Sequence, residues 1–259
     1  MEFPSGLANW KEAGAYRELL AADRSAIAWE WLRRSEDYRR AACGAIAQRA
    51  VTGASLDDAE VAALAWGMHR FEDPRLEAAA GRPMWSAAKM TSVLTARAEP
   101  SPKDADAFLL DSVSQSARVI LSPGCERILL SDGLRSLRID VTGASPRLGP
   151  VRLSYGVEGI RSAAAALATL HAFLNFMTVG QFPRAPRAFA ASARQILLLR
   201  TWDAMIAGAD QREIASALLS ADAAAGRWRV NHPSLRSRAQ RLVRTARHMA
   251  AGGFWRLLA

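Results

Sequence analysis

The sequence predicts an α+β fold that is mainly helical, with a small antiparallel sheet in the middle and a C-terminal helix-turn-helix domain. Apolar residues recur at helical spacing towards both ends of the chain, whereas short alternating runs occupy residues 118–155. Connectors that contain proline lie at residues 70–83 and 181–187. We therefore expect three regions: a Trp-rich helical region at 1–83, a sheet and helix at 84–180 that begin the C-terminal domain, and a basic helix-turn-helix region at 181–259.

The N-terminal region is helical in pattern. Asp23 stands where it can cap a helix that carries Trp29 and Trp31. These two tryptophans are two residues apart, so they cannot share one face of that helix. Either both are core aromatics of a small domain, or one of them packs against another domain or a partner. A further helix is expected from about Leu56 to Gly67.

The middle of the chain changes to short runs with partial alternation, which predict three or four antiparallel strands. Asp132-Gly133 is the strongest hairpin signal among the turns that separate them. From Gly159 to Met177 the spacing returns to that of a helix. The expected strands are residues 118–121, 127–131, 134–141 and 151–155.

Composition limits the class of protein. Half of the 259 residues are hydrophobic, which argues against disorder throughout. Cys43 and Cys125 are too few for a disulfide framework and suit a reducing cytoplasm. No secretory signal is recognised at the start. The apolar stretch from Ala163 to Met177 contains His171 and Asn175 and is short for a membrane span, so we expect a buried helix and a cytoplasmic protein.

The excess positive charge is confined to the C-terminal region. Residues 184–259 hold 13 arginines and 4 acidic residues, whereas residues 1–183 hold 21 basic and 21 acidic residues. Such asymmetry indicates a polyanionic partner, and nucleic acid or an anionic membrane surface would both fit.

Three expected helices make up the basic region. An apolar helix closes at Gly208, and Asp210 with Glu213 forms an acidic relative of the capping box at the start of a short helix. The last helix runs from Ser234 to Ala251. This order is typical of a helix-turn-helix, although the connector from Ser220 to Pro233 is longer than usual and leaves open whether it forms a wing.

The last helix has an apolar stripe and a basic face without a single acidic residue. A basic face is often only a solvated face. Here, however, arginines recur at every third position and repel one another, which phosphate would relieve. We expect Arg236, Ser237, Gln240, Arg241 and Arg244 to face the groove of double-stranded DNA. The expected backbone contacts are Gln211, Arg212, Arg229, Arg238 and Arg247, with Ser234 at the start of the helix.

Catalytic and metal motifs are not found. The histidines are scattered, without a second ligand at metal-binding spacing, and the sequence holds no P-loop, GxSxG or GxGxxG pattern. Clustered carboxylates such as Asp57 and Asp58 suit a helix start. The sequence therefore indicates a protein that is not an enzyme and has no cofactor and no metal.

Two segments resemble a known family. YRELLAADRSAIAWEWLRRSEDYRRAA, at Tyr16–Ala42, resembles the N-terminal regulator-like domain of proteins from bacterial integrative and conjugative elements. GADQREIASALL, at Gly208–Leu219, and SLRSRAQRLVRTARHMAAGGFWRLL, at Ser234–Leu258, resemble the helix-turn-helix domain of unknown function fused to it. LLSDGLRSLRIDVTG, at Leu129–Gly143, resembles the start of that domain. Together they are similar to the excision-activator family of transcriptional activators.

The resemblance implies an activator of genes for excision and transfer of a mobile element, with no catalytic residue and no cofactor. The family also includes small antiactivators made of the C-terminal domain alone. The alternative is therefore a protein-interaction module that binds another regulator without contacting DNA. RNA binding is a weaker third hypothesis because most tryptophans lie outside the basic region. Expected partners are double-stranded DNA and another regulator or RNA polymerase; a homo-oligomer is left open, and no membrane partner is expected.

Overall fold

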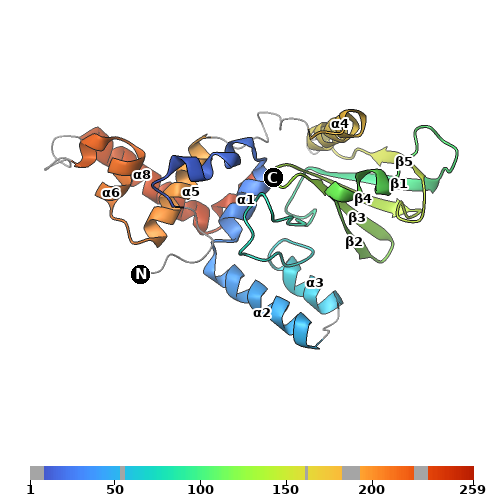
Figure 1. Cartoon of the computed structure of the whole chain (residues 1–259), viewed down its shortest axis with the longest axis horizontal. Helices are drawn as coiled ribbons and strands as arrows, with labels where there is room; N and C mark the ends of the chain where they lie inside the picture. The colour runs from blue at the N-terminus through green and yellow to red at the C-terminus, as the bar shows by residue number, and fades with distance from the viewer. Residues whose placement is uncertain (1–8, 53–55, 161–162, 183–192, 225–232) are drawn as a thin grey trace.

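Helices form both ends of the molecule and a sheet lies between them in sequence, which confirms the α+β fold (Figure 1). The computed structural model describes residues 9–52, 56–160, 163–182, 193–224 and 233–259. Five helices and helical turns open the chain. They are the 3-10 turns Ala13–Tyr16 and Glu18–Ala21, then α1 (Arg24–Leu32), α2 (Glu36–Thr52) and α3 (Leu56–Leu64).

Helix α1 begins where the sequence predicts it. Asp23 accepts a hydrogen bond from the backbone N–H of Ala26 at 2.8 Å, which satisfies one of the free donors at a helix N-terminus. The other carboxylate oxygen of Asp23 accepts the backbone N–H of Ser136 at 2.8 Å. The cap of α1 is therefore also a tie to the sheet.

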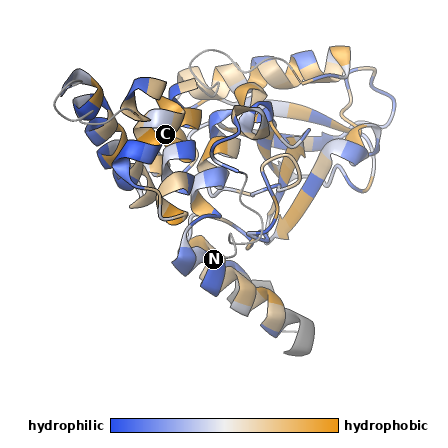
Figure 2. Cartoon of the chain, turned by 60° about the vertical axis from the view of Figure 1, so that its left-hand side comes forward, coloured by the Kyte–Doolittle hydropathy of each residue, from blue (hydrophilic) through white to orange (hydrophobic). Residues whose placement is uncertain are grey.

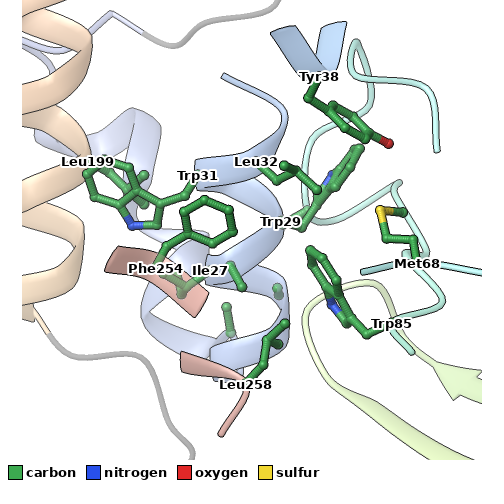
Figure 3. Packing of buried hydrophobic residues seen from close by; sticks show 14 of the residues in the cluster. Ile27, Trp29, Trp31, Leu32, Tyr38, Met68, Trp85, Leu199, Phe254 and Leu258 are labelled. Atoms are coloured by element: carbon green, nitrogen blue, oxygen red, sulfur yellow. The ribbon is translucent and has the colours of Figure 1, made fainter. Parts of the chain in front are cut away.

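Both tryptophans of α1 are buried in one core, on different sides of the helix (Figure 3). Trp31 lies beside Leu199 and Phe254 from the C-terminal part of the chain. Trp29 meets Tyr38 edge to face, with ring centroids 5.6 Å apart. Both tryptophans are therefore core aromatics, and Trp31 also packs against residues of the expected C-terminal region, so each of the two readings holds in part.

The sheet has five strands in the order β2-β3-β4-β1-β5. The hairpin signal at Asp132-Gly133 is confirmed, because β3 and β4 pair antiparallel across it and Gly133 has a φ of 99°. No residue with a side chain could replace Gly133, because a Cβ atom at this position would lie 2.1 Å from the carbonyl oxygen of Ala79. The strands are β1 (Val93–Pro100), β2 (Ala117–Ser122), β3 (Cys125–Ser131), β4 (Ser136–Gly143) and β5 (Val151–Gly156), with a 3-10 segment at Leu110–Ser116.

The expectation of a purely antiparallel sheet of three or four strands is wrong. The first strand, β1, was not predicted, and it pairs parallel to β4 and antiparallel to β5. The sheet is therefore mixed. Residues 93–100 do alternate between exposed and buried positions, but their partners begin more than forty residues later in the chain. Local turn signals do not reveal such a pairing.

Helix α4 (Ala163–Val179) lies along one face of the sheet, at the top of Figures 1 and 2. Phe173 and Phe176 are buried among residues of β1, β4 and β5. The helix is confirmed, but the expectation that it is buried is wrong for its outer side: Leu167 and Leu174 are 54% and 48% exposed. The physical reason is that a helix on a sheet buries one stripe only. No described helix is both long and apolar enough to cross a membrane.

The C-terminal helices return to the other end of the molecule and pack around α1 (Figure 1). Leu198 and Leu199, Ala246, Phe254 and Leu258 join the same core as the tryptophans of α1. The N-terminal and C-terminal helices therefore share one hydrophobic core. The elements are α5 (Ala193–Ile206), α6 (Gln211–Leu218), a 3-10 turn at Ala221–Ala224, α8 (Pro233–Ala250) and a 3-10 segment at Gly253–Leu257.

Candidate nucleic-acid interface

Helix α8 presents its apolar stripe to the protein and its basic face to solvent. Proline at the first position suits a helix start, and Gly252, with a φ of 106°, lies just beyond its end. Both boundaries therefore lie within a residue or two of those predicted. The buried stripe contains Leu235, Ala239, Val243 and Ala246, and these residues pack against α5, α6 and α1.

All five arginines of α8 are exposed and the helix has no acidic residue. Within the described part of the chain, none of them forms an ion pair with a carboxylate. Their charge is therefore available to a partner. The set, called here the basic face, is Arg236, Arg238, Arg241, Arg244 and Arg247, with the exposed polar residues Ser234, Ser237, Gln240 and His248 among them.

The four acidic residues of the C-terminal region are engaged elsewhere. Asp203 pairs with Arg34 of α1 at 2.6 Å, and Asp222 accepts a hydrogen bond from Ser220 Oγ at 2.8 Å. Asp210 and Glu213 form the capping box of α6. The carboxylates of this region therefore stabilise the fold and do not neutralise the positive charge of the basic face.

The arginines cover a wide arc of α8. At about 100° per residue, Arg241 and Arg244 lie opposite the buried stripe, and Arg236 and Arg238 lie on opposite flanks. From Arg236 to Arg247 the helix rises about 16 Å at about 1.5 Å per residue. A ridge of this kind has the dimensions of an element that enters the major groove of DNA, which is about 12 Å wide.

Helices α5 and α6 pack against the apolar stripe of α8. Gly208, with a φ of 80°, ends α5 and turns the chain into α6, as the sequence predicts. The capping box is present: Asp210 accepts the N–H of Glu213 at 2.8 Å, and Glu213 accepts the N–H of Asp210 at 2.8 Å. Ile214 and Ala215 on the inner side of α6 are buried against neighbouring helices.

Comparison with known proteins gives two family matches. Residues 157–259 match a family model described as "T6SS, Transcription factor, DNA binding domain". The chain is a DNA-binding transcriptional regulator. Residues 9–71 match a second model, described as a proteobacterial transcriptional regulator-like domain. No curated protein and no solved structure matches the regulator. Both descriptions point to a non-enzymatic protein.

Two of the expected DNA contacts of the regulator lie on α6. Gln211 is half-buried and Arg212 is exposed. The guanidinium of Arg212 donates hydrogen bonds to the carbonyl oxygens of Ala223, at 3.2 Å, and Ala224. Arg212 therefore also holds the 3-10 turn after α6 in place. Arg229 and the remainder of the connector, residues 225–232, lie outside the described residues.

A buried polar network connects the regulator-like segment to α5, and the sequence analysis did not predict it. Arg34 binds both carboxylate oxygens of Asp203, at 2.6 and 2.9 Å, and Tyr16 donates to the same carboxylate at 2.6 Å. Arg34 also reaches Glu30, which accepts the Nε–H of Arg33 at 2.9 Å. Spacing within α1 could have revealed the Glu30 pairs, but nothing local links Tyr16 or Arg34 to Asp203.

Burial and charge act in opposite directions within this network. Burial alone would lower the pKa of the Arg34 guanidinium, but Asp203 and Glu30 raise it above its usual value. Burial would likewise raise the pKa of Glu30, yet Arg34 and Arg33 hold it below its usual range. Burial, followed by the neighbouring charge of Asp203, raises the pKa of Tyr16. The guanidinium of Arg34 and the carboxylate of Glu30 therefore stay charged at neutral pH, and the hydroxyl of Tyr16 keeps its proton, which suits a structural tie.

The described histidines, His69, His171 and His248, stand apart in the sequence and lie in different segments of the fold. Within the described ranges, no three His, Cys, Asp or Glu side chains lie close enough to hold a metal ion. His69 contacts Glu60 at 2.9 Å, and burial lowers the pKa of the imidazole. Cys43 and Cys125 are both free thiols.

Proposed function

We propose that the regulator binds double-stranded DNA through the basic face of α8, in the manner of a helix-turn-helix protein with α5 and α6 as its support. The observation that carries the proposal is the set of five exposed arginines on one helix, without an acidic residue on that helix and without an ion pair in the described chain. Guanidinium groups fit phosphate oxygens and the guanine edge, so DNA would relieve their mutual repulsion.

A salt titration with a single substitution tests the proposal. Binding of the full-length regulator to promoter DNA from its own locus should weaken steeply with salt, because each neutralised phosphate adds about 0.9 to the negative slope of log K against log[salt]. Arg241→Ala should weaken binding by about 1–3 kcal/mol if Arg241 reads a base. A phosphate contact, such as that expected for Arg238, should instead reduce the slope by about 1.

The matched control is Arg97→Ala on β1, which removes an arginine that is 75% exposed and lies on the sheet. This variant should bind DNA as the parent does. DNA binding that is absent or insensitive to salt would contradict the proposal. A complex with another regulator protein that survives high salt, without any shift of DNA, would favour the protein-interaction module instead.

The proposal extends to activation of transcription. It is supported by the resemblance of Tyr16–Ala42, Gly208–Leu219 and Ser234–Leu258 to excision activators, in which both parts occur on one chain. That resemblance suggests excision and transfer genes of a mobile element, whereas the matched DNA-binding model carries T6SS in its description. Chromatin immunoprecipitation with sequencing in the native host should find the regulator at promoters whose transcripts fall when it is deleted. Transcripts that rise on deletion would identify a repressor.

A further inference from the structure

A surface groove lies where the last turns of α5 and α8 meet the start of α2. Its volume is about 750 Å³, within the range of small-molecule sites. Its apolar lining comes from Trp202, Met205 and Ile206 of α5 and from Ala250 of α8. The three α5 side chains are half-buried, so part of their apolar surface stays exposed in the groove, as in ligand-binding grooves.

The groove stays open because of the direction of α2. After α1 the chain turns at Ser35, and α2 then points away from the rest of the molecule (Figures 1 and 2). Only the first residues of α2 border the groove, so the apolar lining lacks a lid within the described chain.

Two arginines border the groove. Arg39 from α2 and Arg247 from α8 line it, and neither forms an ion pair in the parts of the chain that the structure describes. The charge of Arg34, at the same site, is already matched by Asp203 and Glu30. Glu36, which also lines the groove, is 87% exposed and shares Arg40 with Asp37, at 3.0 and 3.3 Å. An apolar floor with two uncommitted guanidinium groups at its edge is complementary to a molecule that is both apolar and negatively charged.

We propose that this groove binds a small amphipathic anion, with an aromatic or aliphatic body on Trp202 and Met205 and a carboxylate, sulfonate or phosphate held by Arg39 and Arg247. Guanidinium groups bind such anions through charge-assisted hydrogen bonds, and an indole face suits a flat apolar body. Residues of both matched segments, 9–71 and 157–259, line the groove. The ligand therefore bridges the regulator-like segment and the DNA-binding region.

The effect of this ligand on DNA binding rests on the proposed function of the basic face. Arg247 is one of the expected phosphate contacts, so an anion in the groove competes with DNA for its charge. Ligand binding should weaken DNA binding by a few-fold, because only one of the five arginines of the basic face is shared.

The probe for the test is 8-anilino-1-naphthalenesulfonate, an aromatic anion. The full-length regulator is labelled with ¹³C at the methyl groups of its 7 methionines, and the Met205 signal is assigned by Met205→Leu. In a titration without DNA, the Met205 signal should shift saturably. The double variant Arg39→Ala/Arg247→Ala should weaken this binding about tenfold, as expected for loss of a charge-assisted contact. Arg97→Ala is the control and should leave it unchanged.

Two results would overturn the inference. A Met205 signal that stays in place while the probe binds elsewhere would show that the groove is not the site. A Met205 shift with the same affinity in the double variant would show apolar adsorption without recognition of the anion. Because Arg39 and Arg247 are not buried, their loss should not unfold the protein, which circular dichroism checks. The titration contains no DNA, so its outcome is independent of whether the basic face binds DNA.

Discussion

Asp203 is the only acidic residue of α5, and it is 3% exposed. Its charge and that of Glu30 are balanced by Arg33 and Arg34, which are equally buried. Buried ion pairs add little net stability compared with apolar residues, but the loss of one partner strands the other charge in the interior. A substitution that removes one member of a buried ion pair should therefore destabilise the protein much more than a double substitution that removes both members.

We expect Asp203→Asn to destabilise the folded protein by about 3–5 kcal/mol, because Arg33 and Arg34 then share Glu30 alone and the core holds one positive charge in excess. The double variant Arg34→Met/Asp203→Leu should recover much of this loss, since it removes one charge of each sign and leaves Glu30 paired with Arg33 at 2.9 Å. Urea denaturation measures both. Asp222→Asn, at an exposed acidic residue, serves as the control. A double variant that is less stable than the single one would contradict this account.

At the scale of single elements, the sequence predicted the features that depend on neighbouring residues alone. The cap at Asp23, the turn at Gly208, the capping box of α6 and the two faces of α8 could all be predicted from neighbouring residues, and the structure confirms them. The arginines of the basic face are exposed as expected because helical periodicity separates them from the buried stripe. Their contacts with DNA stay a prediction.

Elements whose state depends on distant partners could not be predicted in this way. Strand β1 was missed because it pairs with β4 and β5, which come later in the chain, and no turn joins it to either. The outer side of α4 is exposed because the sheet covers only the stripe with Phe173 and Phe176. The hydrogen bonds of Arg212 to carbonyl oxygens after α6 were missed for the same reason. They form only because the chain that follows α6 folds back beside the Arg212 side chain.

At the scale of the whole molecule, α1 is the central element. Eight of its residues, from Ser25 to Leu32, are buried, and they contact α5, α8 and the last 3-10 segment. The charge of the last helix is conspicuous in the sequence. In the structure, α8 packs on a core that α1 fills, so the part of the chain that matches a regulator-like domain also supports the DNA-binding region.

This arrangement makes a prediction about cooperativity. Trp31→Ala should destabilise the protein by about 3–5 kcal/mol, as for other large aromatic side chains removed from a core. Because Trp31 shares its core with Leu199 of α5 and Ala246 of α8, amide hydrogen exchange should accelerate in α5 and α8 as much as in α1 (Figure 3). Hydrogen exchange followed by mass spectrometry measures this, with Leu121→Ala, at a 55% exposed side chain on β2, as control. Faster exchange confined to residues 9–71 would mean that the two ends of the chain unfold independently despite their common core.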